Sequence, residues 1–358
     1  MCSEKRSVQR VVASMAWLML ILASSGCDAI NSVNQEKTEQ VVPAPLAPAP
    51  VTAPPLTPET PAPVVKTPQQ IIDEFLALPN TEKRDEHLQQ LAGLPEGLDT
   101  ITTLDLSRSG VSDEGMKSLV AFPKLTELNL SETRVSNAGL ASVAKVQTLH
   151  KLTLHSLRAV GDLGVQNLAP LSHLEELTVS ACPVSDASLS TLASFEGLQV
   201  LNLSGCPDFY GRGINPLLGQ KAFRQLRELN VSGSNFGNYG LDQLNKLPQL
   251  EVLRASRCGF AGAAIQGLTG CDRLKVLDLS GNSFFDDNMK VVSRLKNLEE
   301  LRLAQITGLT DECMKSLKIM KHLKLLDLEG TRITEPVVKL HKEKFLKDTE
   351  ILALGQKF

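Results

Sequence analysis

A six-residue pattern, L-x-x-L-x-L, recurs ten times in this chain of 358 residues and limits the folds open to it. The copies begin at residues 101, 125, 149, 174, 198, 226, 250, 274, 298 and 323, at intervals of 24 to 28 residues. A partial eleventh copy, TEILAL, begins at residue 349. Fixed periods of this length are typical of solenoids, in which each repeat packs mainly against its neighbours. We therefore predict a repeat architecture over most of the chain.

Each unit has the pattern of a short strand, a turn and a short helix. Side chains alternate between the two faces of a strand, so the fourth and sixth residues of a pattern, such as Leu128 and Leu130, point to one side. The helical part carries apolar residues three apart, such as Leu241 and Leu244. One unit cannot bury these side chains by itself, so the core must form by the stacking of units.

The repeats resemble leucine-rich repeats, and the pattern LxLSxCxVSDxGL is most similar to the cysteine-containing, ribonuclease-inhibitor-like subclass. The resemblance implies an α/β fold, a leucine-rich-repeat solenoid (horseshoe) with a parallel β-sheet on the concave side and helices on the convex side. We assign the repeats to residues 98–333, an N-terminal helical cap to residues 67–97, and a C-terminal cap with the partial repeat to residues 334–358. Thr67 is the expected N-cap of the first cap helix, with Pro68 at its first position.

Residues 1–26 have the composition of a signal peptide. Three basic residues and one acidic residue precede sixteen uncharged residues, fewer than the roughly 20 apolar residues that a spanning helix needs. Ser25, Gly26 and Cys27 resemble the lipobox of bacterial lipoproteins, in which the cysteine is acylated, although Ser24 stands where that motif usually has leucine. Cys27 is therefore the predicted lipid attachment site. Cleavage without acylation and an uncleaved anchor are the alternatives.

Residues 27–66 form a predicted linker rich in proline and alanine. Ten of the 26 residues from 43 to 68 are proline, which excludes regular helix and sheet and favours polyproline II. Such a spacer would hold a folded domain away from a membrane, and a plain disordered leader has the same composition. Loss of residues 1–26 would change the net charge from −3 to −5, so binding to nucleic acid is not expected.

The ninth residue of each unit explains the cysteines of the repeats. The ten residues at this position are Ser109, Thr133, Leu157, Cys182, Cys206, Ser234, Cys258, Asn282, Ile306 and Thr331, and all but Leu157 and Ile306 are small or polar. Such side chains hydrogen-bond the backbone where it leaves the strand, and a thiol is a compact filler there. We predict that Cys206 is structural. The seven cysteines show no metal spacing and no disulfide framework, so we expect free, buried thiols and no metal or cofactor.

Acidic residues recur where the helical parts begin, after N-cap residues such as Ser112, Ser185 and Thr310. They are Asp113, Asp162, Asp186, Asp286, Asp287, Asp311 and Glu312. Carboxylates favour helix N-termini through the helix dipole, and this interpretation is preferred to calcium binding.

The predicted concave face presents the third and fifth residues of each pattern to solvent. Its middle and late units combine arginines with exposed valines, a composition common at binding hot spots. The candidate partner-binding residues are Glu127, Asn129, Glu228, Arg254, Arg257, Asp278 and Arg302. The unit of 28 residues carries a longer loop, PDFYGRGINP, and it adds the loop candidates Phe209, Tyr210 and Arg212. Inserted loops of repeat proteins often lie on a binding face, and a neutral bulge on the convex side is the alternative.

These features predict a non-catalytic interaction module that is exported and anchored to a membrane, in the periplasm or at the cell surface. The expected partner is a protein, or a glycan, and the module is expected to be a monomer. No grouping of residues suits catalysis, and too few residues lie outside the repeats for a catalytic domain. The alternative is an intracellular adaptor or a substrate-recognition subunit of a ubiquitin-ligase-like complex, although no F-box-like segment precedes the repeats.

Overall fold

A computed structural model describes residues 66–214 and 223–358 of the chain. Within these ranges the strands form one sheet of twelve, in chain order from β1 to β12. The strands are β1 (Thr103–Asp105), β2 (Glu127–Asn129), β3 (Lys151–His155), β4 (Glu176–Ser180), β5 (Val200–Asn202), β6 (Glu228–Asn230), β7 (Val252–Arg254), β8 (Val276–Asp278), β9 (Glu300–Arg302), β10 (Leu325–Asp327), β11 (Glu350–Ala353) and β12 (Gln356–Lys357). The predicted signal peptide, Cys27 and most of the predicted linker lie outside the described residues.

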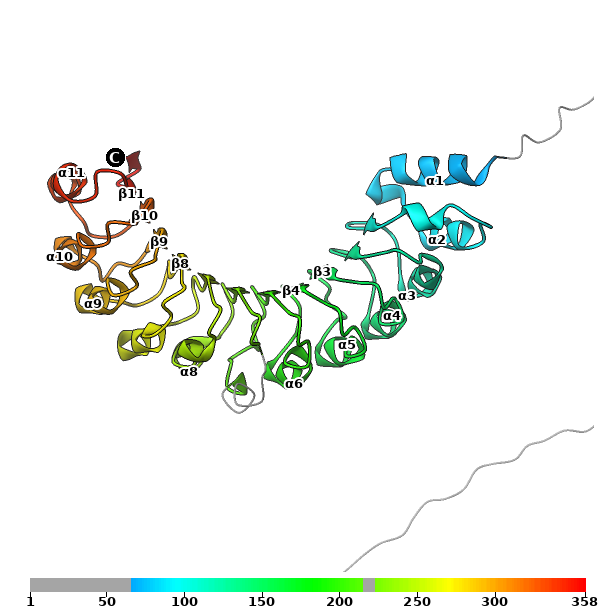
Figure 1. The fold of residues 1–358 in the computed structure, drawn as a ribbon, viewed down its shortest axis with the longest axis horizontal. Coiled ribbons are helices and arrows are strands. Elements are labelled where there is room, and N and C mark those ends of the chain that lie inside the picture. Colours follow the sequence, from blue (N-terminus) through cyan, green and yellow to red (C-terminus); the bar gives the residue numbers. More distant parts are fainter. Residues whose placement is uncertain (1–65, 215–222) are drawn as a thin grey trace, which may run out of the picture. The chain divides into compact units, whose positions relative to one another are not determined.

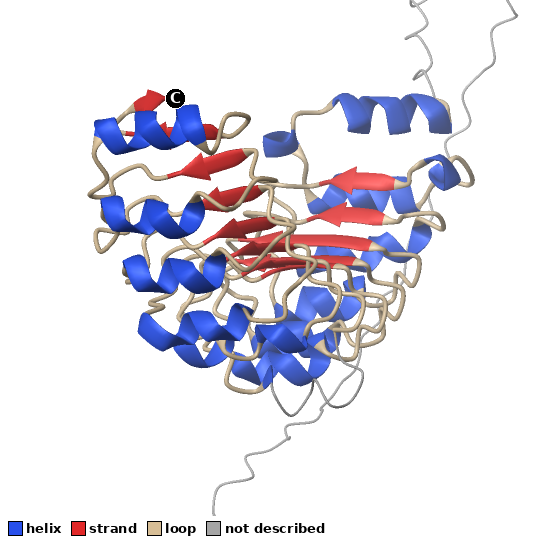
Figure 2. Cartoon of the chain, turned by 60° about the vertical axis from the view of Figure 1, so that its left-hand side comes forward, coloured by secondary structure: helices blue, strands red, loops and turns tan. Residues whose placement is uncertain are grey.

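Strands and helices form two layers, as Figure 1 shows, with the strands on the inner side of the coils and the helices on the outer side. The α-helices are α1 (Pro68–Ala77), α2 (Asp85–Ala92), α3 (Asp113–Met116), α4 (Asn137–Val143), α5 (Asp162–Asn167), α6 (Leu189–Leu192), α8 (Gly237–Leu241), α9 (Met289–Val292), α10 (Met314–Leu317) and α11 (Glu335–Lys344). Figure 2 shows the strands side by side in a single layer. The predicted α/β solenoid is confirmed.

Many of the helical segments are 3₁₀ rather than α. They are η1 (Asn80–Glu82), η2 (Leu98–Thr100), η3 (Lys117–Ala121), η4 (Asp186–Ser188), η5 (Leu244–Lys246), η6 (Gly262–Leu268), η7 (Asp286–Asn288) and η8 (Asp311–Cys313). A 3₁₀ helix has three residues per turn, so side chains three apart lie on one line. The buried pair Ile265 and Leu268 in η6 has this spacing. The three-residue apolar period is therefore consistent with a 3₁₀ segment as well as with an α-helix.

The core runs through every unit between the two layers. The inward leucines of the pattern are buried, and Leu104, Leu152, Leu253 and Leu326 are at most 1% exposed. Parallel pairing in register, such as Leu128 with Leu152 and Leu277 with Leu301, stacks one unit's leucines on the next. The stacked core predicted from the repeat pattern is confirmed.

The first two helices close the N-terminal end of the core. The Thr67 hydroxyl accepts a hydrogen bond from the Gln70 N–H at 3.3 Å, and Pro68 begins α1, as predicted. Helix α2 packs against α3 in the way that the helices of successive units pack. The Asp85 carboxylate accepts hydrogen bonds from the N–H and the hydroxyl of Ser112 at 2.8 and 2.5 Å. Lys83 is 5% exposed, and its ammonium lies 4.9 Å from the centre of the Phe75 ring.

The C-terminal end is closed by a hairpin that the repeat pattern did not predict. Strand β11 extends the parallel sheet as the partial eleventh copy, and β12 returns antiparallel to it. Leu354 and Gly355 join them with positive φ values of 56° and 72°. Two consecutive left-handed residues are typical of the tight two-residue turn of a hairpin.

The acidic residues at the starts of the helices link successive units. Asp113 accepts bonds from the Ser136 N–H at 2.7 Å and the Ser136 hydroxyl at 2.5 Å, and Ser136 is the N-cap of α4 in the next unit. The same bonds join Asp162 to Ser185, Asp286 to Thr310 and Asp311 to Thr334. These carboxylates therefore position the N-cap of the following unit, a role that the dipole argument did not predict.

Asp162 offers a pH test of this ladder. Burial raises the pKa of Asp162, but hydrogen bonds from Ser185 and Ser188 outweigh burial and hold the pKa below its ordinary value. A lowered folded-state pKa stabilises the protein above the unfolded pKa, and this contribution is lost as the pH falls through the folded pKa. We expect the difference in stability between the native protein and Asp162→Asn to shrink as the pH is lowered toward the acidic range. Urea denaturation at several pH values measures it, and a constant difference would contradict the prediction.

Candidate functional site

The concave face is formed by the third and fifth residues of each pattern because the fourth and sixth turn into the core. In β7, Val252 and Arg254 flank the fully buried Leu253. The parallel register repeats this arrangement, so Val252 lies opposite Val276 and Arg254 opposite Asp278. Equivalent side chains therefore form rows that cross the strands.

The fifth-position residues of β7 to β10 alternate in charge. Arg254 is in register with Asp278, Asp278 with Arg302, and Arg302 with Asp327. Adjacent strands lie about 4.8 Å apart, so opposite charges follow each other at that spacing. We call these four residues the charge row. The fourth, Asp327, was not among the candidates, although its place in the repeat identified it.

Glutamates at the third position hold both arginines of the charge row. The Arg254 guanidinium lies 3.6 Å from the Glu228 carboxylate, and Arg302 lies 2.5 Å from Glu300. The bond to Glu300 raises the pKa of Arg302, and the charges of Asp278 and Asp327 add to it. The two arginine side chains remain 46% and 45% exposed, so these pairs orient the guanidinium groups but contribute little stability.

The acidic members of the charge row also shape the backbone. The Oδ1 atoms of Asp278 and Asp327 accept the N–H of the residue two positions later, at 2.9 and 3.0 Å. Asn129 does the same for Ser131 at 3.0 Å. Such bonds stabilise the turn that follows a strand. In the described part of the chain, Oδ2 of Asp278 and of Asp327 accepts no hydrogen bond.

An apolar row lies beside the charge row. It consists of Val252, Val276 and Leu325 at the third position, and the Glu300 bound to Arg302 interrupts it. All three apolar side chains are half-buried. Branched side chains are common in strands, but here Val252 and Val276 on adjacent strands, and Leu325 beyond Glu300, place apolar surface next to positioned charges.

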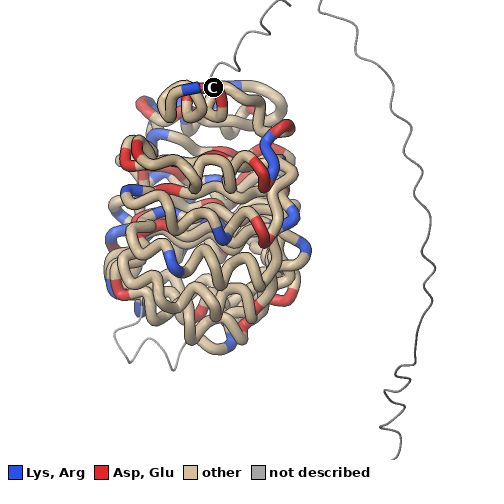
Figure 3. Tube along the Cα trace, turned by 90° about the vertical axis from the view of Figure 1, so that its right-hand side faces the viewer, with Lys and Arg blue, Asp and Glu red and all other residues tan. Residues whose placement is uncertain are grey.

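A further row of charges lies at the second position, at the edge where the strands begin. Lys275 binds Glu251 at 2.7 Å, and Lys324 binds Glu299 at 2.5 Å. Figure 3 shows that basic and acidic residues are interspersed along the coils. The late units therefore carry many charges of both signs rather than a field of one sign.

The structure separates the predicted contact residues into two groups. Glu228, Arg254, Asp278 and Arg302 lie on the consecutive strands β6 to β9. Glu127 and Asn129 lie on β2, with three strands between β2 and β6. The residues at the fifth position of the intervening strands are uncharged: Thr153, Thr178 and Asn202. The early group also lies beside a charge pair, because Lys151 on β3 is in register with Glu127 and binds Glu176 at 2.7 Å. Among the described strands, the late group is distinguished by charges that alternate at the fifth position.

Arg257 lies outside these rows, at the eighth position of its unit, where the chain leaves the strand. Its φ is 54°. All ten units have a positive φ at this position: Arg108, Glu132, Ser156, Ala181, Gly205, Gly233, Arg257, Gly281, Gln305 and Gly330. The left-handed conformation costs a residue with a Cβ roughly 1–2 kcal/mol, so its recurrence shows that the strand exit requires this backbone.

Comparison with known proteins identifies the repeats. A family model described as Leucine Rich repeat matches residues 99–120 and 123–144. The solved internalin inlF of Listeria monocytogenes is similar over 75% of this chain and 76% of its own, at 21% identity and a TM-score of 0.53. Residues 99–144 therefore contain leucine-rich repeats, and the described part of the chain has the fold of a leucine-rich-repeat solenoid.

Two further solved structures are similar to this repeat protein. Internalin C2 of Listeria monocytogenes is 22% identical over 63% of this chain and 93% of its own, with a TM-score of 0.46. The plant peptide hormone receptor RGFR1, solved in complex with RGF2, is 16% identical over 70% of this chain and 39% of its own, with a TM-score of 0.43. No curated protein matches the sequence. The likeness to internalin inlF concerns the fold.

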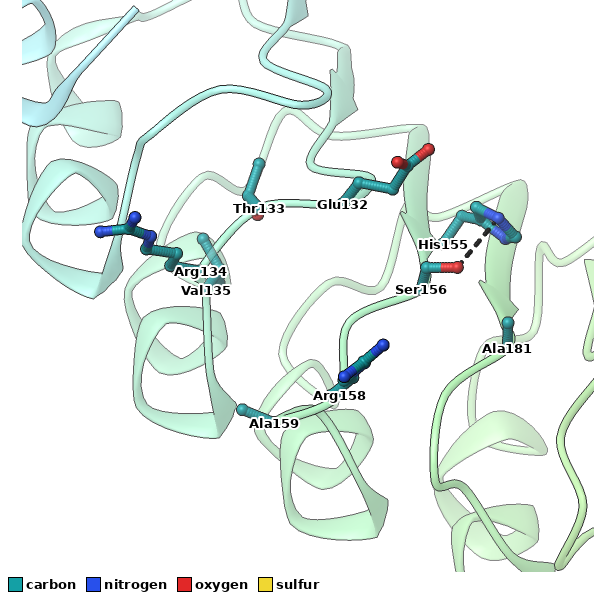
Figure 4. Close-up of a pocket in the computed structure, with 9 residues that line it drawn as sticks. All are labelled: Glu132, Thr133, Arg134, Val135, His155, Ser156, Arg158, Ala159 and Ala181. Carbon is teal, nitrogen blue, oxygen red and sulfur yellow. Dashed lines mark hydrogen bonds between the residues drawn. The ribbon is translucent and has the colours of Figure 1, made fainter. Parts of the chain in front are cut away.

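A hollow of about 880 Å³ lies on the edge where the strands end, between the second and fourth units. Figure 4 shows Arg158 extending toward Ser156 and Ala181, while Arg134 extends away from His155. Both nitrogens of the His155 ring are engaged, by the hydroxyl of Ser180 at 2.8 Å and that of Ser156 at 3.0 Å. Because the two arginines do not converge, the hollow lacks the arrangement of an anion site.

The loop candidates are only partly exposed, and the prediction for Phe209 is wrong. Phe209 is 1% exposed and stacks on Phe236 at 5.9 Å between ring centres. The insertion shifts this aromatic residue along the loop but leaves it in the core position that phenylalanine occupies in the following units. The sequence indicates this role, because the three following units also have a phenylalanine at this place in the core: Phe236, Phe260 and Phe284.

The other two loop candidates are exposed but lie beside the helical layer. The Asp186 carboxylate accepts the backbone N–H groups of Tyr210, Gly211 and Arg212 at 2.9, 2.7 and 3.0 Å. Asp186 is the first residue of η4, so these bonds hold the loop at the start of a helical segment. Arg212 lies over the Tyr210 ring at 5.0 Å. This loop is separate from the charge row.

The cysteines that lie within the described residues have the predicted structural role. Cys182, Cys206, Cys258, Cys271 and Cys313 are free and buried. At the ninth position, the thiols of Cys206 and Cys258 donate to the carbonyls of Val179 and Val231 at 3.0 and 3.1 Å. Burial raises the pKa of Cys258 to about 11 and that of Cys313 to about 12. These thiols are therefore protonated at neutral pH.

We expect N-ethylmaleimide to leave these five cysteines unmodified in the native protein at pH 7.5 and to modify them after denaturation in urea. The reason is that alkylation needs an accessible thiolate, and burial removes both accessibility and charge. Peptide mass spectrometry measures the modification at each cysteine. Rapid modification of Cys206 before unfolding would contradict its structural role.

Within residues 66–214 and 223–358, no three His, Cys, Asp or Glu side chains gather closely enough to hold a metal ion. Every helix described there is too short or too polar to span a bilayer.

Proposed function

We propose that this leucine-rich repeat protein is a non-catalytic binding module that recognises a protein through its concave sheet. The observation that supports this is the charge row beside the apolar row on strands β7 to β10. Arginine next to apolar surface is a composition of binding hot spots, and a rigid sheet presents it without a large loss of conformational entropy. The matching family model describes a repeat and indicates no reaction.

We further propose that the module is exported and tethered to a membrane through Cys27. The support is the sequence before the repeats, with its short apolar run, its lipobox-like residues and its proline-rich stretch. Acylation would anchor the chain, and the extended spacer would place the repeats away from the lipid surface. Radioactive palmitate should label the native protein in cells and should not label Cys27→Ala. Equal labelling of the two would refute the attachment site.

Site-specific photo-crosslinking tests the binding face. We would introduce p-benzoylphenylalanine at Thr178 or Val276 on the concave face and, as controls, at Ser194 or Arg294 beside the helical layer. Illumination of cells should give discrete adducts with another protein from the concave positions only. Adducts from the control positions alone, or from none of the four, would contradict the proposal.

A further inference from the structure

We infer that the charge row and the apolar row bind an amphipathic α-helix of the partner, laid across strands β7 to β10. This inference rests on the proposed function and specifies the secondary structure and the charge order of the partner. The bound helix would run across the strands, so that each of its turns meets one strand.

The spacing of the rows favours a helix over an extended segment. Four parallel strands at about 4.8 Å place the first and last members of the charge row about 14 Å apart. Side chains at i, i+4, i+7 and i+11 of an α-helix lie on one face and span about 16 Å. Four same-face side chains of an extended segment span about 20 Å, because they recur every second residue. The helix is about 2 Å longer than the charge row, and long side chains can bridge that difference. The extended segment is about 6 Å longer, which is too much for them to bridge.

The charge row specifies the order of charges on the helix. The partner would place acidic residues opposite Arg254 and Arg302 and basic residues opposite Asp278 and Asp327. Because the row alternates, a helix of uniform charge would meet two like charges, which costs affinity. An alternating helix placed in the reverse direction presents the opposite order, so the order of charges also sets the direction of the helix.

The apolar row provides the contact that buries surface. Val252, Val276 and Leu325 are half-buried and lie next to the charge row on the same strands. An apolar strip on the partner helix, next to its charged positions, would cover them. An amphipathic helix binds a surface in this way, with apolar anchors and flanking charges.

The row is positioned before binding. Glu228 and Glu300 already hold Arg254 and Arg302, and each guanidinium has five N–H donors, so donors remain for a partner carboxylate. Asp278 and Asp327 use Oδ1 for the backbone, and their Oδ2 atoms can accept from a lysine. Side chains that are fixed in advance lose little entropy on binding.

The test uses two fluorescein-labelled, alanine-based helical peptides with the same leucine strip. The alternating peptide carries Glu, Lys, Glu and Lys at i, i+4, i+7 and i+11, and the lysine peptide carries Lys at all four positions. Fluorescence anisotropy with the full chain in mild detergent measures both affinities. We expect the native protein to bind the alternating peptide about tenfold more tightly than the lysine peptide. A proline in the middle of the alternating peptide should weaken its binding by about tenfold, because it breaks the helix.

Charge-reversing variants test the row directly. Arg254→Glu with Arg302→Glu makes the row uniformly acidic, so the preference should reverse toward the lysine peptide. Arg254→Gln with Arg302→Gln keeps the side-chain length and should reduce the preference for the alternating peptide. The matched control, Arg158→Glu with Arg294→Glu, makes the same change in net charge off the concave face and should keep the native preference. Circular dichroism confirms that each variant is folded.

Two results would overturn the inference: equal binding of the two peptides by the native protein, or undiminished binding of the proline-containing peptide. If crosslinks form from the concave face and yet the peptides are not discriminated, the inference fails and the proposed function stands. If no concave crosslinks form, the proposed function itself fails.

Discussion

Replacing Phe236 with alanine should lower the free energy of unfolding by about 3–5 kcal/mol, because it removes a large side chain from a packed core and leaves a cavity. Phe236 is 1% exposed and lies between Phe209, at 5.9 Å, and Phe260, at 6.4 Å between ring centres. It therefore connects the core of the longest unit to the units that follow. Urea denaturation monitored by circular dichroism measures the change.

Tyr239→Ala is the matched control for this variant. Tyr239 lies in the same helix, α8, but is 48% exposed. Removal of an exposed ring should change stability by about 0.5 kcal/mol or less. Equal effects of the two substitutions would show that the aromatic stack does not support the solenoid.

Asn282→Ala should lower the free energy of unfolding by about 4 kcal/mol or more, because it leaves four buried backbone groups unpaired at about 1–3 kcal/mol each. Asn282 is 5% exposed. Its Oδ1 accepts the N–H groups of Cys258 and Phe260 at 3.0 and 3.1 Å, and its Nδ2 donates to the carbonyls of Ala255 and Leu279 at 2.9 and 2.8 Å. One side chain thus satisfies four backbone groups in two successive units.

Asn297→Ala is the control here, since Asn297 is exposed and donates one bond, to the carbonyl of Asp272 at 2.6 Å. It should cost about 1 kcal/mol or less. A similar loss in both variants would show that the bonds of Asn282 are replaced by water and do not stabilise the stack.

The periodic leucines made the fold predictable from the sequence. Leu128, Leu253 and Leu326 could be assigned to the core from their place in the pattern, because only stacked units can bury them. The same comparison between units showed that Cys206 is structural, since its counterparts are other small or polar residues. Phe209 shows the limit of this comparison. An insertion of a few residues hid its alignment with Phe236, and the residue was mistaken for a loop contact.

The binding surface was predictable only in part. The pattern placed Arg254 and Arg302 on the concave face, but their pairing with Glu228 and Glu300 depends on side-chain conformations that a pattern does not specify. The role of Asp186 was not predictable either, because it binds a loop 24 to 26 residues further along the chain.

The sequence alone determined the repeating unit, the inward and outward positions of each strand and the structural role of its cysteines, because these follow from a local period and from burial. Only the tertiary structure decided which groups of adjacent units bond: the Asp113–Ser136 link, the four bonds of Asn282, the hairpin after Ala353 and the pairing of Arg254 with Glu228. The physical reason is that contacts between units depend on register and stacking, which bring together residues about 24 positions apart.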